Sequence, residues 1–163
     1  MADLTIRING FNRHSVRNAI TKLKKYQTTS NQQVNEACMK VADFGAKWAQ
    51  SLFDSVGKGN YDGNYDVTVT AEPTQDGARV VASGETVLFI EYGAGVHRGY
   101  GHPDPQGYGP GTYPGKGHWN DPNGWWYRHG ERTLGNPPSA AMYYAEQAMR
   151  RELDNIVRGT LST

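Results

Sequence analysis

Hydrophobic residues change their spacing several times along the chain, and each spacing predicts a different element. Residues 4–8 alternate apolar and polar side chains, which predicts a short strand. From Ser15 to about Tyr26 the apolar residues recur at helical spacing, which predicts a helix with Ser15 as its N-cap. After a polar joint, QTTSNQQ, a long amphipathic helix is predicted from Asn31 to Ser55. Its apolar face contains Val34, Cys38, Val41, Gly45, Trp48 and Leu52.

The middle of the chain has the composition of β structure. YDVTVTAE and ARVVAS flank the turn QDG and predict a β-hairpin, in which Gly77 suits a positive φ. TVLFIEY, after Gly84, is continuously apolar and rich in β-branched and aromatic residues, so it predicts a strand that is covered on both faces. We expect an antiparallel sheet of three to four strands, packed against the long helix.

A terminal helix is predicted from about Pro138 to Arg158. Proline suits the first turn, the Arg158 side chain suits the last turn, and Gly159 suits the position just beyond. Its apolar face contains Met142, Ala145, Met149, Leu153 and Ile156. The fold class is therefore α+β, and 163 residues without an internal linker predict a single domain over 1–163.

Residues 93–136 have no periodicity and form a Gly/aromatic arm in this interpretation. They hold 12 of the 20 glycines, five prolines, four of the five histidines and seven aromatic residues. Loops of this length are usually functional or disordered, and disordered segments are poor in aromatic residues. We interpret the arm as a segment that folds fully against a partner; a self-packed loop is the alternative.

The charge balance, the apolar stretches and the cysteine content argue against several classes of protein. Lys and Arg total 17 against 16 Asp and Glu, so no global field attracts nucleic acid or a membrane. No stretch has the length and apolarity of a signal peptide or a membrane span, and Cys38 is the only cysteine. We expect a soluble chain made in a cytoplasm, with a locally basic N-terminal end.

The arm contains the residue types of a metal site without the spacing of one. The candidates are His97, His102, His118 and His129, with Asp104, Asp121 and Glu131 nearby. Zinc peptidases place two histidines on one helical turn, and nothing here is spaced that way. A single carboxylate such as Glu91 or Glu131 is more often a surface or interface charge than an acid–base catalyst, and Cys38 lies on an apolar helix face. We expect no catalytic residue, no metal and no cofactor.

Two short segments carry a resemblance to a known family. The first, IEYGAG, contains Glu91, Tyr92, Gly93 and Ala94, and the second, GNPPSAAMYYAEQAM, begins with Gly135, Asn136, Pro137, Pro138, Ser139 and Ala140. With the order of the predicted elements over 4–92 and 133–158, they resemble the tail-component family of long-tailed bacteriophages. Members of that family are head–tail joining or tail-completion proteins of the virion neck. The loop over 95–132 is longer than this family leads us to expect.

The resemblance implies a non-enzymatic virion protein, assembled in the host cytoplasm, whose copies form a ring, six-fold by analogy with other neck proteins. The ring would contact adjoining head-completion and tail-terminator or tail-tube proteins. We predict subunit contacts at Glu91, Tyr92, Gly93, Tyr100, Tyr108, Tyr113, Trp119, Trp125, Trp126, Tyr127, Pro137 and Pro138. Cations that could face DNA in the lumen are Arg13, Arg17, Lys22, Lys24 and Lys25.

Glu91 has a structural alternative to a subunit contact. At the end of a buried strand its carboxylate could cap the last helix or pair with a basic neighbour. Three other functions remain open at this point. One is a tail-terminator ring, and another is a carbohydrate-binding or cell-wall-active tail module that uses the aromatic arm. The third is a DNA-binding protein that works through the cations of residues 7–25.

Overall fold

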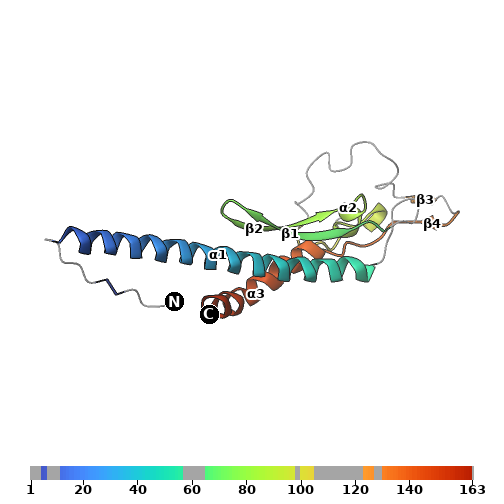
Figure 1. Ribbon diagram of the computed structural model, residues 1–163. Coiled ribbons are helices and arrows are strands. Elements are labelled where there is room, and N and C mark those ends of the chain that lie inside the picture. The colour runs from blue at the N-terminus through green and yellow to red at the C-terminus, as the bar shows by residue number, and fades with distance from the viewer. Residues whose placement is uncertain are drawn as a thin grey trace.

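The computed structural model describes residues 5–6, 12–56, 65–97, 100–104, 123–126 and 130–162. Figure 1 shows the order of the elements along the chain. They are α1 (Arg13–Val56), β1 (Thr68–Thr74), β2 (Gly77–Ser83), α2 (Val87–Glu91), the 3₁₀ turn η1 (Gly95–His97), β3 (Trp125–Trp126), β4 (Arg132–Thr133) and α3 (Ala141–Leu161).

Helix α1 replaces the two helices predicted over 15–26 and 31–55 with one continuous helix of 44 residues. The prediction of a break at QTTSNQQ was wrong, because polar residues do not interrupt a helix that is exposed to solvent. Neither Gly nor Pro, which would interrupt it, occurs between Arg13 and Phe44. The helix begins at Asn12, whose Oδ1 accepts hydrogen bonds from the backbone N–H groups of His14 and Ser15 at 2.9 and 3.4 Å.

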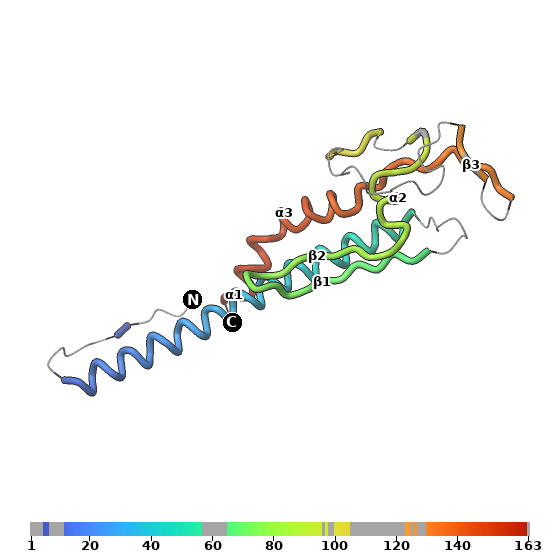
Figure 2. The backbone as a smooth tube through the Cα atoms, turned by 90° about the horizontal axis from the view of Figure 1, so that it is seen from above, coloured from blue at the N-terminus to red at the C-terminus, as the bar shows by residue number. Residues whose placement is uncertain are grey.

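The predicted hairpin is confirmed. Strands β1 and β2 pair antiparallel, with Thr68 opposite Ser83 and Thr74 opposite Gly77. Gln50 of α1 attaches the hairpin to the helix: its Oε1 accepts from the N–H of Val69 at 2.8 Å, and its Nε2 donates to the carbonyl of Val67 at 3.2 Å. The hairpin therefore lies along the C-terminal half of α1 (Figure 2).

The strand predicted for TVLFIEY is wrong, because Val87–Glu91 form the short helix α2. A short apolar run is compatible with a buried strand or a buried helix, and its surroundings decide between them. Here Asp66 accepts hydrogen bonds from the backbone N–H groups of Glu85 and Thr86 at 2.6 and 3.2 Å, and from Thr86 Oγ1 at 2.6 Å. These bonds satisfy donors where α2 begins and so favour the helix.

Because this segment is helical, the described residues form two two-stranded sheets, β1–β2 and β3–β4, and not one sheet of three to four strands. Of the strand predicted at 4–8, Thr5 and Ile6 are described and lie in no strand, while its other residues lie outside the described part. The two-stranded sheet β1–β2, packed on α1 beside α3, still gives the expected mixture of helix and sheet.

Helix α3 begins three residues later than predicted and continues to Leu161, so Gly159 lies inside it. Ala140 has a left-handed backbone with φ 51°, so the chain turns sharply immediately before the helix begins. The start of α3 packs on the end of α1, and the two helices run antiparallel. The two helices pack tightly at Gly45, where an added Cβ would overlap the side chain of Met149.

The core lies over the C-terminal half of α1. Its buried members are Ala49, Phe53, Val67, Ile90, Ala141 and Ala145. By contrast, Ile20 and Leu23 in the first half of α1 are 48% and 49% exposed. Figures 1 and 2 show that this half extends beyond the hairpin and beyond α3.

Candidate functional site

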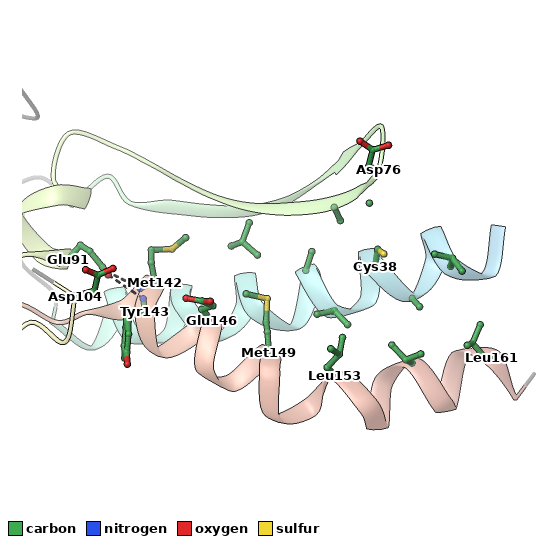
Figure 3. A pocket seen from close by; sticks show the side chains of 18 of the residues that line it. Cys38, Asp76, Glu91, Asp104, Met142, Tyr143, Glu146, Met149, Leu153 and Leu161 are labelled. Carbon is green, nitrogen blue, oxygen red and sulfur yellow. Dashed lines mark hydrogen bonds between the residues drawn. The ribbon is translucent and has the colours of Figure 1, made fainter. Parts of the chain in front are cut away.

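An open groove with a cavity volume of about 650 Å³ lies between α1, the hairpin and α3. Val34, Cys38 and Val41 of α1 form its floor, Gly77 and Ala78 of β2 form one wall, and residues from Met142 to Leu161 of α3 form the other. Figure 3 shows Cys38 below the hairpin tip and shows the side chains of Met149, Leu153 and Leu161 directed from α3 towards α1. These side chains make the groove mainly apolar.

The charges at the groove are of one sign. Its described lining includes four carboxylates and no Lys or Arg: Asp76 at the hairpin tip, Glu91, Asp104 and Glu146. Glu146 also pairs with Arg150 at 2.6 Å, but both side chains are exposed, and such pairs exchange partners at little cost. The groove therefore favours an apolar partner that carries positive charge.

Glu91 closes one end of the groove and is buried. Its Oε2 accepts a hydrogen bond from the N–H of Met142 at 2.9 Å, and its Oε1 accepts one from the N–H of Tyr143 at 3.3 Å. A carboxylate at this place satisfies two of the unpaired donors at the start of α3 and interacts favourably with the helix dipole. The predicted role of Glu91 as a cap of the last helix is confirmed, although the residue stands on a helix and not on a strand.

His102 joins Glu91 from the arm. Its Nε2 lies 3.3 Å from Glu91 Oε1, and its Nδ1 accepts a hydrogen bond from the N–H of Asp104 at 3.0 Å. These bonds assign the proton to Nε2, which then donates to the carboxylate. The ring of Tyr92 contacts the imidazole at a tilt of 42°, with centroids 4.6 Å apart. This cluster is a buried joint that ties residues 100–104 to the start of α3.

The two segments that carry the family resemblance contact each other directly. The N–H groups of Ser139 and Ala140 donate to the carbonyls of Ile90 and Glu91 at 2.8 and 3.1 Å, and the N–H of Ala94 donates to the carbonyl of Asn136 at 2.8 Å. Asn136 Nδ2 donates to the carbonyl of Phe89 at 2.9 Å. The two motifs, which are more than 40 residues apart in sequence, therefore form one structural unit.

The residues predicted for subunit contacts differ in exposure where the structure describes them. Glu91 and Gly93 are buried within the chain, Tyr92 lines the groove, and Pro137 is exposed beside the half-buried Pro138. Tyr100 and Trp126 are 83% and 63% exposed, and Trp125 pairs with Thr133 in the β3–β4 ladder. Tyr108, Tyr113, Trp119 and Tyr127 lie outside the described residues.

The five predicted DNA-facing cations, Arg13, Arg17, Lys22, Lys24 and Lys25, are all exposed and all lie in the first half of α1. They surround the helix and do not share one face, because 3.6 residues per turn place Lys22 and Lys25 away from the side that carries Arg17 and Lys24.

No group of three or more potential metal ligands occurs among the described residues. Of the histidine-rich set, His97, His102, Asp104 and Glu131 are described, whereas His118, Asp121 and His129 are not. No helix in the described ranges is long and apolar enough to cross a membrane.

The groove itself was not predicted. The sequence did show apolar stripes on both of the helices that line it, including Val34, Cys38, Val41, Met149 and Leu153. What it did not show is that the hairpin and α3 leave the floor of the groove partly uncovered. Comparison with known proteins gave no match to a family model, to a curated protein or to a solved structure.

Proposed function

We propose that this chain is a structural, non-enzymatic protein of the neck of a long-tailed phage, and that identical copies form a ring which completes the tail and joins it to the head. The observation that carries the proposal is the contact between the two family-like segments. Four hydrogen bonds join residues 89–94 to residues 136–140. Because the two segments build one corner of the fold together, there is a physical reason for both motifs to occur in the same chain.

Surfaces suited to assembly support the proposal. The chain leaves large apolar side chains exposed on α1, including Ile20, Leu23 and Val34, and it has an open apolar groove. Contiguous apolar surface on a folded protein usually marks an interaction site. Both surfaces would be covered in an assembly of many copies.

The cationic first half of α1 also suits a lumen through which DNA passes. Six cations lie in residues 1–25 against the single acid Asp3, which is enough for weak and non-specific phosphate contacts. The proposal therefore predicts DNA binding that is weak in the isolated chain and falls steeply as salt is raised.

The first experiment is immunogold electron microscopy of virions, with an antibody raised against the purified protein. Gold at the junction of capsid and tail is the expected result. Protein that is missing from the particles would overturn the proposal. A second test is deletion of Gly99–Glu131, which should leave a folded chain and abolish the joining of heads to tails; infectious particles from that mutant would remove the arm from the proposal.

Exposed aromatic side chains favour one rival function. Tyr100 and Trp126 stand in solvent at 83% and 63% exposure, and such rings can stack on sugars. A carbohydrate-binding tail module predicts gold at the tail tip and retention on peptidoglycan. A neck protein predicts neither result. A tail-terminator ring, the rival of the same class, predicts gold at the junction and particles whose tails have the wrong length when the protein is absent.

A further inference from the structure

The exposed apolar side chains in the first half of α1 lie on the helix face that also forms the floor of the groove. At about 100° per residue, Leu23 lies about 60° to one side of Ile20, and Val34 and Cys38 lie within about 40° of Ile20. Val34 and Cys38 line the groove, whereas Ile20 and Leu23 do not line it and are about half exposed. One continuous apolar face is thus covered by its own chain over only part of its length.

Cations follow this face along one edge. By the same helical geometry, Arg13, Arg17 and Lys24 lie within about 60° of Ile20, on the side opposite Leu23. We call these five residues, Arg13, Arg17, Ile20, Leu23 and Lys24, the basic stripe. No Asp or Glu occurs between Asn12 and Asn35, so the charge of the stripe is not offset along the helix.

The groove has the complementary properties. Its walls are apolar, and its charged lining residues are carboxylates, with Asp76 on the hairpin side and Glu146 on the α3 side. The lengths also agree: α3 lines the groove from Met142 to Leu161, which spans about 28 Å of helix, and residues 13–33 of α1 span about 30 Å.

Charge decides which surfaces pair. Two basic stripes packed against each other would bring together six cations, three from each α1 helix, and no Asp or Glu lies between Asn12 and Asn35 to offset them. Two grooves packed against each other would bring together like-charged carboxylates. Pairing of a stripe with a groove joins opposite charges and covers both apolar surfaces at once.

We propose that the first half of α1 (residues 13–33) of one copy docks in the groove of a second copy, with Ile20 and Leu23 towards the apolar walls and the stripe cations towards Asp76 and Glu146. The contact joins two different surfaces, so every bound copy still offers one free stripe and one free groove. Such a contact repeats until it closes into a ring or grows into a filament. This inference rests on the proposed self-assembly and identifies the surfaces that would carry it.

Two blocked variants test the pairing. The stripe variant, Ile20→Glu with Leu23→Glu, keeps the groove intact, and the groove variant, Glu146→Lys with Leu153→Lys, keeps the stripe intact. All four side chains are between 44% and 49% exposed, so both variants should keep the fold, which circular dichroism checks. Mass is measured by light scattering after size exclusion, over a series of concentrations.

The wild-type chain should form assemblies larger than a dimer, and each variant alone should be a monomer. An equimolar mixture of the two variants should give a one-to-one heterodimer and nothing larger, because one intact stripe and one intact groove remain for one contact. A groove variant that dimerises alone would show stripe-to-stripe pairing and overturn the proposal. A mixture that stays monomeric would also overturn it.

Single substitutions of equal charge provide a matched control. Lys24→Glu on the stripe should shift the assembly midpoint to higher concentration, and more so at low salt. Lys22→Glu, on the opposite side of the same helix, should leave the midpoint unchanged. Equal effects of the two substitutions would overturn the docking geometry. If the wild-type chain assembles but the mixture of the two variants forms no heterodimer, this contact is rejected, and the neck-ring proposal is left to the immunogold test. If the wild-type chain stays monomeric at every concentration, the docking is rejected.

Discussion

Glu91 and Met142 are 51 residues apart in the sequence, and the Oε2 atom of Glu91 accepts a hydrogen bond from the backbone N–H of Met142 at 2.9 Å. The start of α3 is therefore set by a side chain of α2. Asp66 does the same for α2, because it accepts hydrogen bonds from Glu85 and Thr86 at 2.6 and 3.2 Å. Both helices therefore begin at carboxylates from other parts of the chain.

Substitution of Glu91 should be costly for stability. In Glu91→Gln, the amide NH₂ that replaces Oε2 would face the N–H of Met142, so that a buried donor loses its acceptor. We expect the free energy of unfolding to fall by about 1–3 kcal/mol. Urea denaturation measures the change. The control is Glu146→Gln, which removes an exposed ion pair and should cost less than about 1 kcal/mol; equal costs would contradict the capping role.

Gly93 and Gly159 should respond in opposite directions to alanine. Gly93 has a φ of 77°, and a Cβ there would lie 2.7 Å from the carbonyl oxygen of Asn136 and 2.8 Å from the nitrogen of Pro138. Gly93→Ala should lower the free energy of unfolding by about 2 kcal/mol or more. Gly159 lies within α3 with nothing within 4 Å of the added Cβ. Gly159→Ala should raise stability by about 0.5–1 kcal/mol. Thermal denaturation of both variants checks the signs.

Gln50 should be the main polar attachment of the hairpin to α1. Gln50→Ala removes the acceptor for the N–H of Val69 and the donor to the carbonyl of Val67, so we expect a loss of about 1–3 kcal/mol. Hydrogen exchange at the Val69 amide should become faster in the same variant. Gln32→Ala, on the exposed first half of α1, is the control and should change stability by less than about 0.5 kcal/mol. An unchanged exchange rate at Val69 would show that Gln50 does not hold this strand.

Asp66 should give the chain an acid-sensitive contribution to stability. Burial opposes ionisation of its carboxyl, but hydrogen bonds from Thr86 Oγ1 and from the N–H groups of Glu85 and Thr86 prevail and lower the pKa of Asp66 below its ordinary value of 3.8. The ionised form therefore stabilises the fold above the unfolded pKa, and this stabilisation is lost as the pH falls through the folded pKa.

The variant that tests this is Asp66→Asn. The difference in unfolding free energy between wild type and Asp66→Asn should be constant between about pH 5 and 7 and should shrink as the pH falls below 3.8. A difference that stays constant down to acid-induced unfolding would contradict the assigned hydrogen bonds.

The spacing of hydrophobic residues was enough to predict an element where it fitted only one type of secondary structure. Alternation on both sides of QDG predicted the hairpin, and its turn falls where Thr74 and Gly77 pair. The helical spacing from Val34 onward predicted the part of α1 that packs on the body. The sequence also contained a signal against the predicted break, since residues 13–44 lack Gly and Pro.

The failures share a physical cause. TVLFIEY has strand-like composition, but Asp66, about 20 residues earlier, accepts hydrogen bonds from the N–H groups of Glu85 and Thr86, immediately before the helix. The start of α3 likewise depends on Glu91 and on the left-handed Ala140, and not on the prolines before it. Contacts between residues distant in sequence determine the secondary structure here, and the composition of a short segment does not reveal such contacts.

The candidate site was predictable only in part. Capping of the last helix was one of two structural roles expected for Glu91, and its carboxylate does accept the N–H groups of Met142 and Tyr143. The groove exists because α3 and the hairpin diverge from each other over α1. This separation is set by tertiary packing, which the hydrophobic pattern of each element does not specify. The basic end of the chain was visible in the sequence, but its place on a helix that extends past the body was not.

The length of α1 gives the chain a lever arm. Its 44 residues span about 66 Å, and only the second half is held by the hairpin and α3. A tilt of about 10° where the body grips the helix moves the far end of the 30 Å overhang by roughly 5 Å. In the proposed assembly, a small adjustment in the packing of Gly45 against Met149 would therefore change the separation between neighbouring copies, and one sequence would fit rings of different diameter.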